Sequence, residues 1–245
     1  MKELDGLVAI VTGAARNIGR SIALDLADGG AAVALVGRSD VAGLDSVAAE
    51  ISERGGRARA VQADIAKPDD VKRMVAETLT HFGRIDILVN NAGIRPEAPL
   101  AEITLEDWRA VMAVSLEGPF LAAQAALSAL EKTKGTIINI GGLTAYTGAM
   151  HRAHVVAAKA GLDGLTKALA VELAEKGVTV NLVSPGMIAT ARARPAPAHH
   201  KTRTTPLGRR GTPEEVSAMV RFLAGPNGRY ITGQTIHVNG GVFLP

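Results

Sequence analysis

The sequence predicts an α/β fold: a single-domain, Rossmann-like, doubly wound seven-stranded parallel sheet that spans residues 1–245. Three observations support this prediction. Seven short apolar runs alternate with helical patterns, no internal repeat or interdomain linker interrupts the alternation, and 47% of the 245 residues are hydrophobic, enough for one large core. Strands joined by helical crossovers pair in parallel, because parallel neighbours need long connections.

The predicted strands are runs rich in valine, isoleucine and alanine, bounded by turn residues. They lie at residues 7–11, 32–36, 60–63, 85–89, 136–140, 179–183 and 235–238. Between them, apolar residues recur every three or four positions, which is typical of helices packed on a sheet. The last helix has a marked start, with Thr212 as the N-cap, Pro213 in the first turn and Glu215 placed to reach back to the cap amide.

Composition excludes several classes of protein. The chain has no cysteine, which rules out disulfides and cysteine-ligated metals and suits a cytoplasmic location. Its net charge of +3 is too small to indicate nucleic-acid binding. The first apolar run is shorter than a signal-peptide core, and no run approaches the roughly 18 apolar residues of a membrane span. The adjacent His199 and His200 lack an acidic companion, so we expect no metal site.

A proline-rich segment, residues 189–211, is the one break in composition, and we interpret it as a lid over the site. Between Gly186 and Thr212 there is no acidic residue. The cations in this interval are Arg192, Arg194, Lys201, Arg203, Arg209 and Arg210. Such a lid favours an anionic small-molecule substrate, whereas the alternative is a solvated basic loop with Arg209 or Arg210 packed near the next helix.

A dinucleotide site is predicted where the first strand meets the first helix. Thr12 to Gly19 form a glycine-containing turn that opens a helix, whose free amides and positive dipole end suit a pyrophosphate. The second strand ends with Gly37 and Arg38, and it offers a guanidinium to a 2′-phosphate where an NAD site would place a carboxylate. NADP(H) is therefore the expected cofactor. The alternative is that Arg38 is a solvated loop arginine.

Further motifs occur along the chain in a fixed order. They are Thr12-Gly13 to Gly19, Asp64, Asn90-Asn91-Ala92-Gly93, Ala157 to Gly161, Ser184-Pro185-Gly186 with Thr190, and Ile231 to Gly241. With these motifs the chain resembles the short-chain dehydrogenase/reductases over nearly its full length, and it is similar to their 3-oxoacyl-carrier-protein reductase branch. The resemblance implies a homodimer or homotetramer, and we expect assembly through the helices that carry Trp108 and Leu165.

The resemblance also implies which residues bind the cofactor. Asp64 and Ile65 would contact the adenine, and the segment after the sixth strand would meet the nicotinamide. The expected set is Gly13, Arg16, Asn17, Ile18, Gly19, Arg38, Asp64, Ile65, Asn90, Ala92, Gly93, Lys159, Pro185, Gly186, Ile188 and Thr190. Asn17 stands where the family has its middle glycine, a tolerable change because asparagine adopts positive φ more readily than most residues.

The catalytic residues depart from the family pattern. The resemblance implies an asparagine, a serine, a tyrosine and a lysine that move a proton at the substrate oxygen. Lys159 is present, but Val155 stands at the tyrosine position, Gly142 at the serine position and Ser115 at the asparagine position. Flanking motifs fix the alignment on both sides of these positions.

Two hypotheses follow. In the first, the protein is an NADP-dependent oxidoreductase whose proton comes from His151, His154 or Tyr146, which precede Lys159 in the chain. If the helix already includes residue 151, His151 shares a face with Val155 and Lys159. In the second, the fold binds a nucleotide without hydride transfer, as a lyase, hydrolase or isomerase, or as a catalytically silent subunit.

Overall fold

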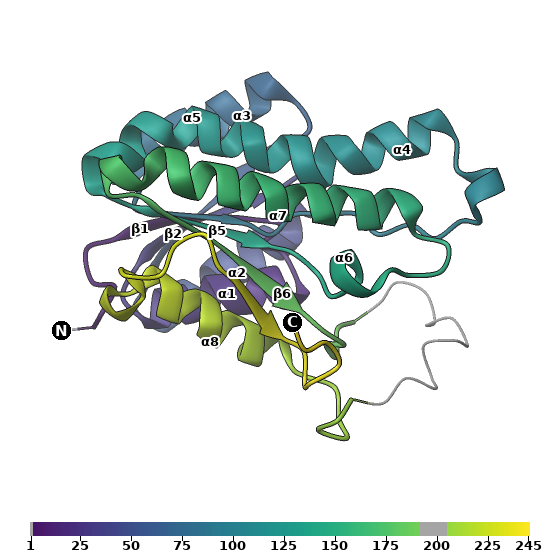
Figure 1. The fold of residues 1–245 in the computed structure, drawn as a ribbon. Coiled ribbons are helices and arrows are strands. Elements are labelled where there is room, and N and C mark those ends of the chain that lie inside the picture. Colours follow the sequence, from purple (N-terminus) through teal and green to yellow (C-terminus); the bar gives the residue numbers. More distant parts are fainter. Residues whose placement is uncertain (1, 192–204) are drawn as a thin grey trace.

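A parallel sheet of seven strands forms the centre of the protein (Figure 1). The computed structural model describes residues 2–191 and 205–245. The strands are β1 (Val8–Thr12), β2 (Ala32–Gly37), β3 (Arg57–Gln62), β4 (Ile87–Asn90), β5 (Thr136–Ile140), β6 (Thr179–Pro185) and β7 (Thr235–Val238). They lie in the order β3-β2-β1-β4-β5-β6-β7, and every neighbouring pair is parallel. The predicted fold class is confirmed.

Helices cover both faces of the sheet. They are α1 (Asn17–Asp28), α2 (Val41–Glu53), α3 (Pro68–Phe82), α4 (Leu105–Met112), α5 (Gly118–Thr133), α6 (Thr144–Thr147), α7 (Ala153–Leu173) and α8 (Pro213–Ala224). Helices α3, α5 and α7 lie on one face, whereas α1, α2 and α8 lie on the other (Figure 1). Each layer buries its own apolar cluster, with Met74 and Leu130 in the first and Leu26 and Val220 in the second.

Two predicted boundaries can be compared with the structure. Strand β3 begins at Arg57, ahead of the predicted residue 60, because an edge strand tolerates arginines at its exposed positions. The start of α8 is confirmed: Thr212 Oγ1 accepts a hydrogen bond from the Glu215 amide at 3.4 Å, and Glu215 accepts one from the Thr212 amide at 2.8 Å. This capping box fixes the chain just before the helix.

Helices α4 and α5 are joined by a π-helical turn, η2 (Ala113–Glu117), into one stretch from Leu105 to Thr133. This stretch is long and apolar enough to cross a membrane by length and composition alone, with a mean hydropathy of 1.4, and 39% of the tested window is buried inside the protein. Charged residues interrupt this stretch, so it contains no long unbroken apolar run and the sequence did not predict it. Helices of a protein core pass the same test, and Leu130 belongs to the core here.

The order of strands reverses between β1 and β4. Strand β1 pairs with β2 on one side and with β4 on the other, so the chain leaves these neighbouring strands in opposite directions. Ligands of doubly wound sheets bind in the crevice that such a reversal opens at the carboxyl ends of the strands.

Thr12, the last residue of β1, ties the two diverging turns together. Its side chain is fully buried, and Oγ1 accepts hydrogen bonds from the amides of Asn91 and Ala92, both at 3.0 Å. The same hydroxyl donates to the Val89 carbonyl at 3.3 Å. One side chain therefore sets the spacing between the turn after β1 and the turn after β4.

We predict that Thr12→Val lowers the free energy of unfolding by about 1–3 kcal/mol, because the partly buried amides of Asn91 and Ala92 lose their acceptor while the shape of the side chain is kept. Urea denaturation measures the change. Thr78→Val is the matched control: Thr78 is equally buried, but its hydroxyl only donates to the Met74 carbonyl at 2.8 Å within α3. Equal effects of the two substitutions would contradict the role assigned to Thr12.

Candidate active site

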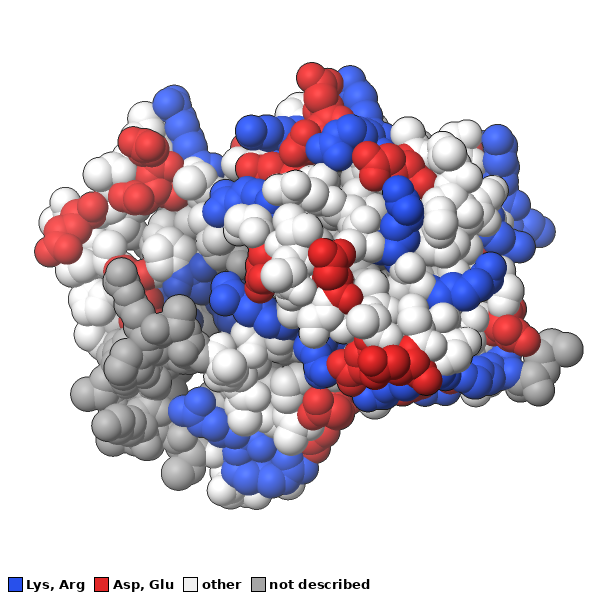
Figure 2. All heavy atoms as spheres, turned by 180° about the vertical axis from the view of Figure 1, so that it is seen from behind, with Lys and Arg blue, Asp and Glu red and all other residues white. Residues whose placement is uncertain are grey.

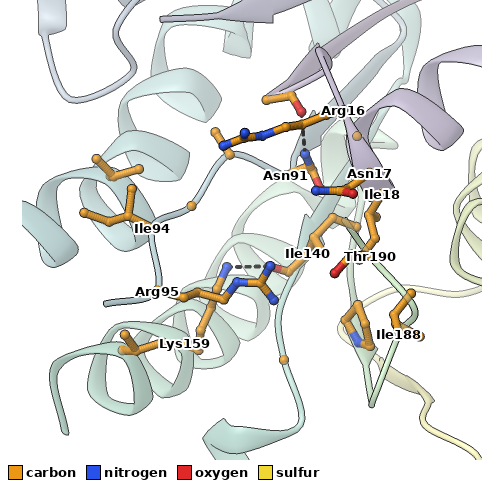
Figure 3. Close-up of a pocket in the computed structure, with 18 of the residues that line it drawn as sticks. Arg16, Asn17, Ile18, Asn91, Ile94, Arg95, Ile140, Lys159, Ile188 and Thr190 are labelled. Atoms are coloured by element: carbon orange, nitrogen blue, oxygen red, sulfur yellow. Dashed lines mark hydrogen bonds between the residues drawn. The ribbon is translucent and has the colours of Figure 1, made fainter. Parts of the chain in front are cut away.

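A cavity of about 790 Å³ opens at the carboxyl ends of the central strands (Figure 3). All but one of the residues expected to bind the cofactor line it. These are Gly13, Arg16, Asn17, Ile18, Gly19, Arg38, Asp64, Ile65, Ala92, Gly93, Lys159, Pro185, Gly186, Ile188 and Thr190. The exception is Asn90. The tertiary structure thus gathers segments that are far apart in the sequence into one continuous surface.

The turn between β1 and α1 forms one end of the cavity and is packed too tightly for side chains. Gly13 has a φ of 67°, and a Cβ on Gly19 would lie 2.1 Å from the Gly13 carbonyl oxygen. Arg16 is the N-cap of α1, but its side chain does not cap the helix. The first amides of α1 are therefore left for an anion, as a pyrophosphate requires.

Asn91, and not the predicted Asn90, belongs to this cradle. The Asn90 side chain points into the protein and donates to Asn139 Oδ1 at 2.9 Å. Asn91 Nδ2 donates to the carbonyls of Thr12 and Gly13 at 2.8 and 3.1 Å and so holds the turn in place. The two asparagines are adjacent in the sequence, and only the direction in which the strand's last residue points distinguishes them.

Asn17 adopts a left-handed conformation, with a φ of 52°, as expected for the residue that replaces a glycine. Its side chain has a second role. Asn17 Nδ2 donates to the Ala191 carbonyl at 3.1 Å, and the Ala191 amide donates to Asn17 Oδ1 at 2.9 Å. This pair of hydrogen bonds attaches the segment after β6 to the cradle, which a glycine cannot do.

The proposed lid can be described only at its two ends. Arg192, Arg194, Lys201 and Arg203 lie outside the described residues, as do His199 and His200. Arg210 lines the cavity. Arg209 instead makes a two-pronged contact with Glu215, at 2.6 and 2.9 Å, at the start of α8. Arg209 therefore packs near the next helix, which was the alternative to a lid residue that the sequence left open.

The end of β2 presents a cation to the cavity. The side chain of Arg38 is 64% exposed and lies 3.9 Å from Asp64. Asp40, the nearest carboxylate along the chain, accepts a hydrogen bond from the Gly43 amide at 3.1 Å as the N-cap of α2. That carboxylate is committed to the helix, so Arg38 remains the group suited to a 2′-phosphate.

Lys159 lies at the opposite end of the cavity, and its ammonium group is buried. Nζ donates to the Ile140 carbonyl at 2.6 Å, a contact drawn in Figure 3. Burial, and to a lesser degree the charge of Arg95, lowers the pKa of Lys159 to about 8. The amine therefore changes its protonation state close to neutral pH, as a group that exchanges protons must.

Gly142 and Val155 line the same end of the cavity as Lys159. A Cβ added to Gly142 would meet no atom within 4 Å, so this position is open space. Val155 is 2% exposed and packs on Val111 and Ala158. Two positions at which the resemblance predicts hydroxyl groups thus offer no hydrogen bond from a side chain.

Ser115 lies in the π-helical turn η2 and points toward Lys159. A methyl group placed on Gly93 would lie 3.6 Å from Ser115 Oγ and 3.7 Å from Lys159 Nζ, so both atoms approach the same point. Ser115 is fully buried, and within the described part of the chain its hydroxyl has no hydrogen-bond partner. A π-helical turn is typical of functional sites, but it leaves no signal in the sequence.

The three other residues proposed as proton donors do not line the cavity. His151 is exposed with a φ of 58° and precedes α7, which begins at Ala153, so the helical spacing to Lys159 does not apply. His154 is buried against α4, where its charge acts on Asp107. Helix α7 starts after His151, so the helical spacing argument fails for that residue, whereas His154 lies within α7 and does not line the cavity.

Tyr146 is part of α6 and does not line the cavity. Its hydroxyl donates to Asp163 Oδ1 at 2.8 Å, and its ring stacks on Phe243 with the centroids 5.4 Å apart. Burial is the main cause that raises the pKa of Tyr146 to about 12. The tyrosine thus belongs to a packed cluster near the C-terminus and is a poor acid at neutral pH.

Several cavity residues on the loops after β4 and β5 were not predicted from the sequence. Arg95 follows the Asn-Asn-Ala-Gly motif, and Met150 and Arg152 precede α7. Seen from the back, basic side chains gather in a hollow of the surface (Figure 2). Loop residues of this kind have no periodicity, so only their position beside a recognised motif could have drawn attention to them.

The chain resembles known proteins over nearly its whole length. Residues 13–243 match the family model described as enoyl-(acyl carrier protein) reductase. A 3-oxoacyl-[acyl-carrier-protein] reductase of Synechocystis sp. is 46% identical, with 100% of both chains covered. The chain belongs to the short-chain dehydrogenase/reductase family, in the branch of the 3-oxoacyl-[acyl-carrier-protein] reductases.

Solved structures show the same relationship. A blue fluorescent protein from a metagenomic library, in complex with NADPH, superposes with a TM-score of 0.93 at 38% identity, covering 99% of this chain and 100% of that one. A short-chain dehydrogenase from Burkholderia cenocepacia J2315, in complex with NADP, gives a TM-score of 0.92 at 37% identity over 98% of both chains.

The lowered pKa of Lys159 predicts a specific dependence of stability on pH. Between pH 8 and 10.5 the unfolded lysine binds a proton that the folded one has lost, so stability rises with pH in this window. Relative to Lys159→Met, the wild type should gain about 3 kcal/mol across it. Urea denaturation at several pH values measures the free energy of unfolding of both proteins. If the two dependences on pH were parallel, the pKa of Lys159 would not be lowered in the folded protein.

Proposed function

We propose that this protein is an NADP(H)-dependent oxidoreductase that reduces a carbonyl group of a small molecule, with Lys159 as the proton donor. One observation carries the proposal: a single cavity combines the glycine cradle at α1 with a buried lysine whose neighbours Gly142 and Val155 cannot donate hydrogen bonds from their side chains. The absence of cysteine further favours a cytoplasmic location.

The residues present fit NADP(H). The crowded turn at Gly13 and Gly19 leaves room for a pyrophosphate and none for side chains, and the N-terminus of α1 is not capped by a side chain. Arg38 and Arg16 would hold the 2′-phosphate, and Pro185, Gly186 and Thr190 would lie at the nicotinamide end. When bound, NADPH supplies the hydride. Both structural relatives described above were solved with this type of dinucleotide.

Lys159 supplies the proton in this proposal. The ammonium group donates to the carbonyl oxygen of the substrate, which becomes an alcohol, and the amine then takes up a proton from water. With a pKa of about 8, the group is mostly protonated at pH 7 yet acidic enough to release its proton. Ser115 Oγ, buried near Nζ and without a partner in the described part of the chain, would hold a water molecule for this exchange.

We further infer that the protein forms homo-oligomers through α4 and α7, the helices that carry Trp108 and Leu165, together with α5 of the same layer. Trp108 on α4 and Phe120 on α5 are 36% and 44% exposed, and Leu105 at the start of α4 is 61% exposed. Large apolar side chains gathered on one helical layer are typical of a subunit interface. Leu165 of the neighbouring helix α7 belongs to the same prediction from the sequence.

Arg38→Ala should weaken NADPH binding by roughly tenfold or more, since a charge-assisted contact with the 2′-phosphate contributes about 1.5–3 kcal/mol. NADH binding should stay nearly unchanged. Calorimetric titration with both dinucleotides measures the preference. Arg59→Ala, on an exposed position of edge strand β3, is the matched control. Equal affinity of the wild type for NADPH and NADH would refute the assignment.

Lys159→Met should reduce the oxidation of NADPH by carbonyl compounds about 10²–10⁴-fold, because the proton donor is lost. In the wild type, the rate of carbonyl reduction should fall as pH rises through about 8, where the ammonium group deprotonates. Loss of NADPH absorbance in a panel of ketones and aldehydes provides the rate. A rate independent of Lys159 would exclude the lysine as the donor.

A double variant serves as the control for this reaction. Gly142→Ser fits sterically, and Val155→Tyr restores the phenol that the resemblance predicts, so the pair should raise turnover of simple ketones. If only this variant reduced carbonyl compounds and the wild type reduced none, the oxidoreductase proposal would be wrong. A nucleotide-binding role without hydride transfer would then replace it.

A further inference from the structure

Two segments that are far apart in the sequence line the cavity along the path of a dinucleotide. The start of α1 contributes Asn17 and Ile18, and the chain after β6 contributes residues 186–188 and Thr190 at the expected nicotinamide end (Figure 3). A ligand that contacts both segments at once needs them at a fixed separation. Its affinity therefore depends on how firmly the protein sets that separation before the ligand arrives.

The first part of the chain after β6 is fixed by backbone hydrogen bonds. The Gly186 amide donates to the carbonyl of Val238, the last residue of β7, at 2.9 Å. The Ala189 amide donates to the Gly211 carbonyl at 2.8 Å, and the Gly211 amide donates to the Met187 carbonyl at 3.0 Å. These contacts tie the segment to the sheet and to the chain before α8, but they do not tie it to the start of α1.

The side chain of Asn17 supplies the connection to α1. Its Nδ2 donates to the Ala191 carbonyl at 3.1 Å, and its Oδ1 accepts a hydrogen bond from the Ala191 amide at 2.9 Å. Because one side chain holds both backbone groups of Ala191, it sets the orientation of this residue as well as its position. Thr190, which lines the cavity, lies between this contact and the pairing with Gly211.

The backbone at Asn17 restricts which residues can make this contact. Asn17 is the first residue of α1 and has a φ of 52°, a left-handed conformation that glycine and asparagine adopt most readily. Glycine, the residue that the family resemblance predicts here, has no side chain to offer. Asparagine combines tolerance of this conformation with one hydrogen-bond donor group and one acceptor, which is what a backbone amide and carbonyl require.

We propose that Asn17 is a positioning residue for the nicotinamide half of NADP(H), because its side chain fixes residues 186–191 relative to the start of α1. This inference rests on the proposed cofactor site and assigns a role within it. A segment that is ordered in advance loses less conformational entropy when a ligand binds. The two hydrogen bonds of Asn17 therefore increase the affinity for a ligand that contacts both segments, and they leave unchanged the affinity for a ligand that contacts the start of α1 alone.

The test compares NADPH with 2′-phospho-ADP-ribose, which has the same phosphates but no nicotinamide ring. Asn17→Gly removes the side chain and keeps the left-handed backbone. In calorimetric titrations this variant should bind NADPH roughly 3- to 10-fold more weakly than the wild type, the effect of losing two solvent-exposed hydrogen bonds. Its affinity for 2′-phospho-ADP-ribose should be unchanged. The dissociation rate of NADPH, followed by the fluorescence of its reduced ring, should rise by a similar factor.

Lys134→Gly is the matched control. Lys134 has a φ of 51° at the end of α5 and does not line the cavity, so the substitution makes the same backbone change elsewhere and should alter the affinity for neither ligand. If Asn17→Gly weakened both ligands equally, or neither, the inference would be overturned while the assignment of the cofactor stands. If the wild type bound neither ligand, the proposed reductase function and this inference would fall together.

Discussion

The contact between the turns that follow β1 and β4 is the constraint on which the cavity depends. The Thr12 hydroxyl accepts hydrogen bonds from the amides of Asn91 and Ala92. The Asn91 side chain in turn donates hydrogen bonds to the carbonyls of Thr12 and Gly13. Because these hydrogen bonds are partly shielded from water, breaking one costs more than breaking a solvated contact would. They hold the cradle open at the point where the strand order reverses.

The two ends of the cavity are built on different physical principles. At the cradle, the site is made of backbone groups. The tight turn at Gly13 and Gly19 exposes backbone amides, and side chains at these positions would clash with their neighbours. At the other end lies the buried ammonium group of Lys159, for which we propose the role of proton donor. Burial lowers the pKa of Lys159. The buried side chain of Val155, on the same helix, makes the surroundings of the amine apolar. One fold thus combines a helix N-terminus without a side-chain cap and a buried lysine in a single cavity.

Most of the fold and of the cofactor end could be predicted from the sequence. Alternating strand and helix patterns predict a doubly wound parallel sheet. Crossover connections between parallel strands are right-handed, and strands that follow one another in the sequence tend to be neighbours in the sheet. Motifs such as Thr12 to Gly19 and Gly37-Arg38 lie directly after strands, so the topology brings them to one edge. The departures at Gly142 and Val155 were also visible, because flanking motifs fix their positions, and the structure places both beside Lys159.

The sequence by itself determined the order of the elements, most residues of the cradle and the absence of hydroxyl groups at Gly142 and Val155. Only the tertiary structure decided the direction of individual side chains. It turned Asn90 inward, packed Tyr146 against Phe243, started α7 after His151 and brought Arg95 to the cavity. Local patterns report burial and periodicity, whereas these directions depend on loop conformation and on contacts between residues far apart in the chain.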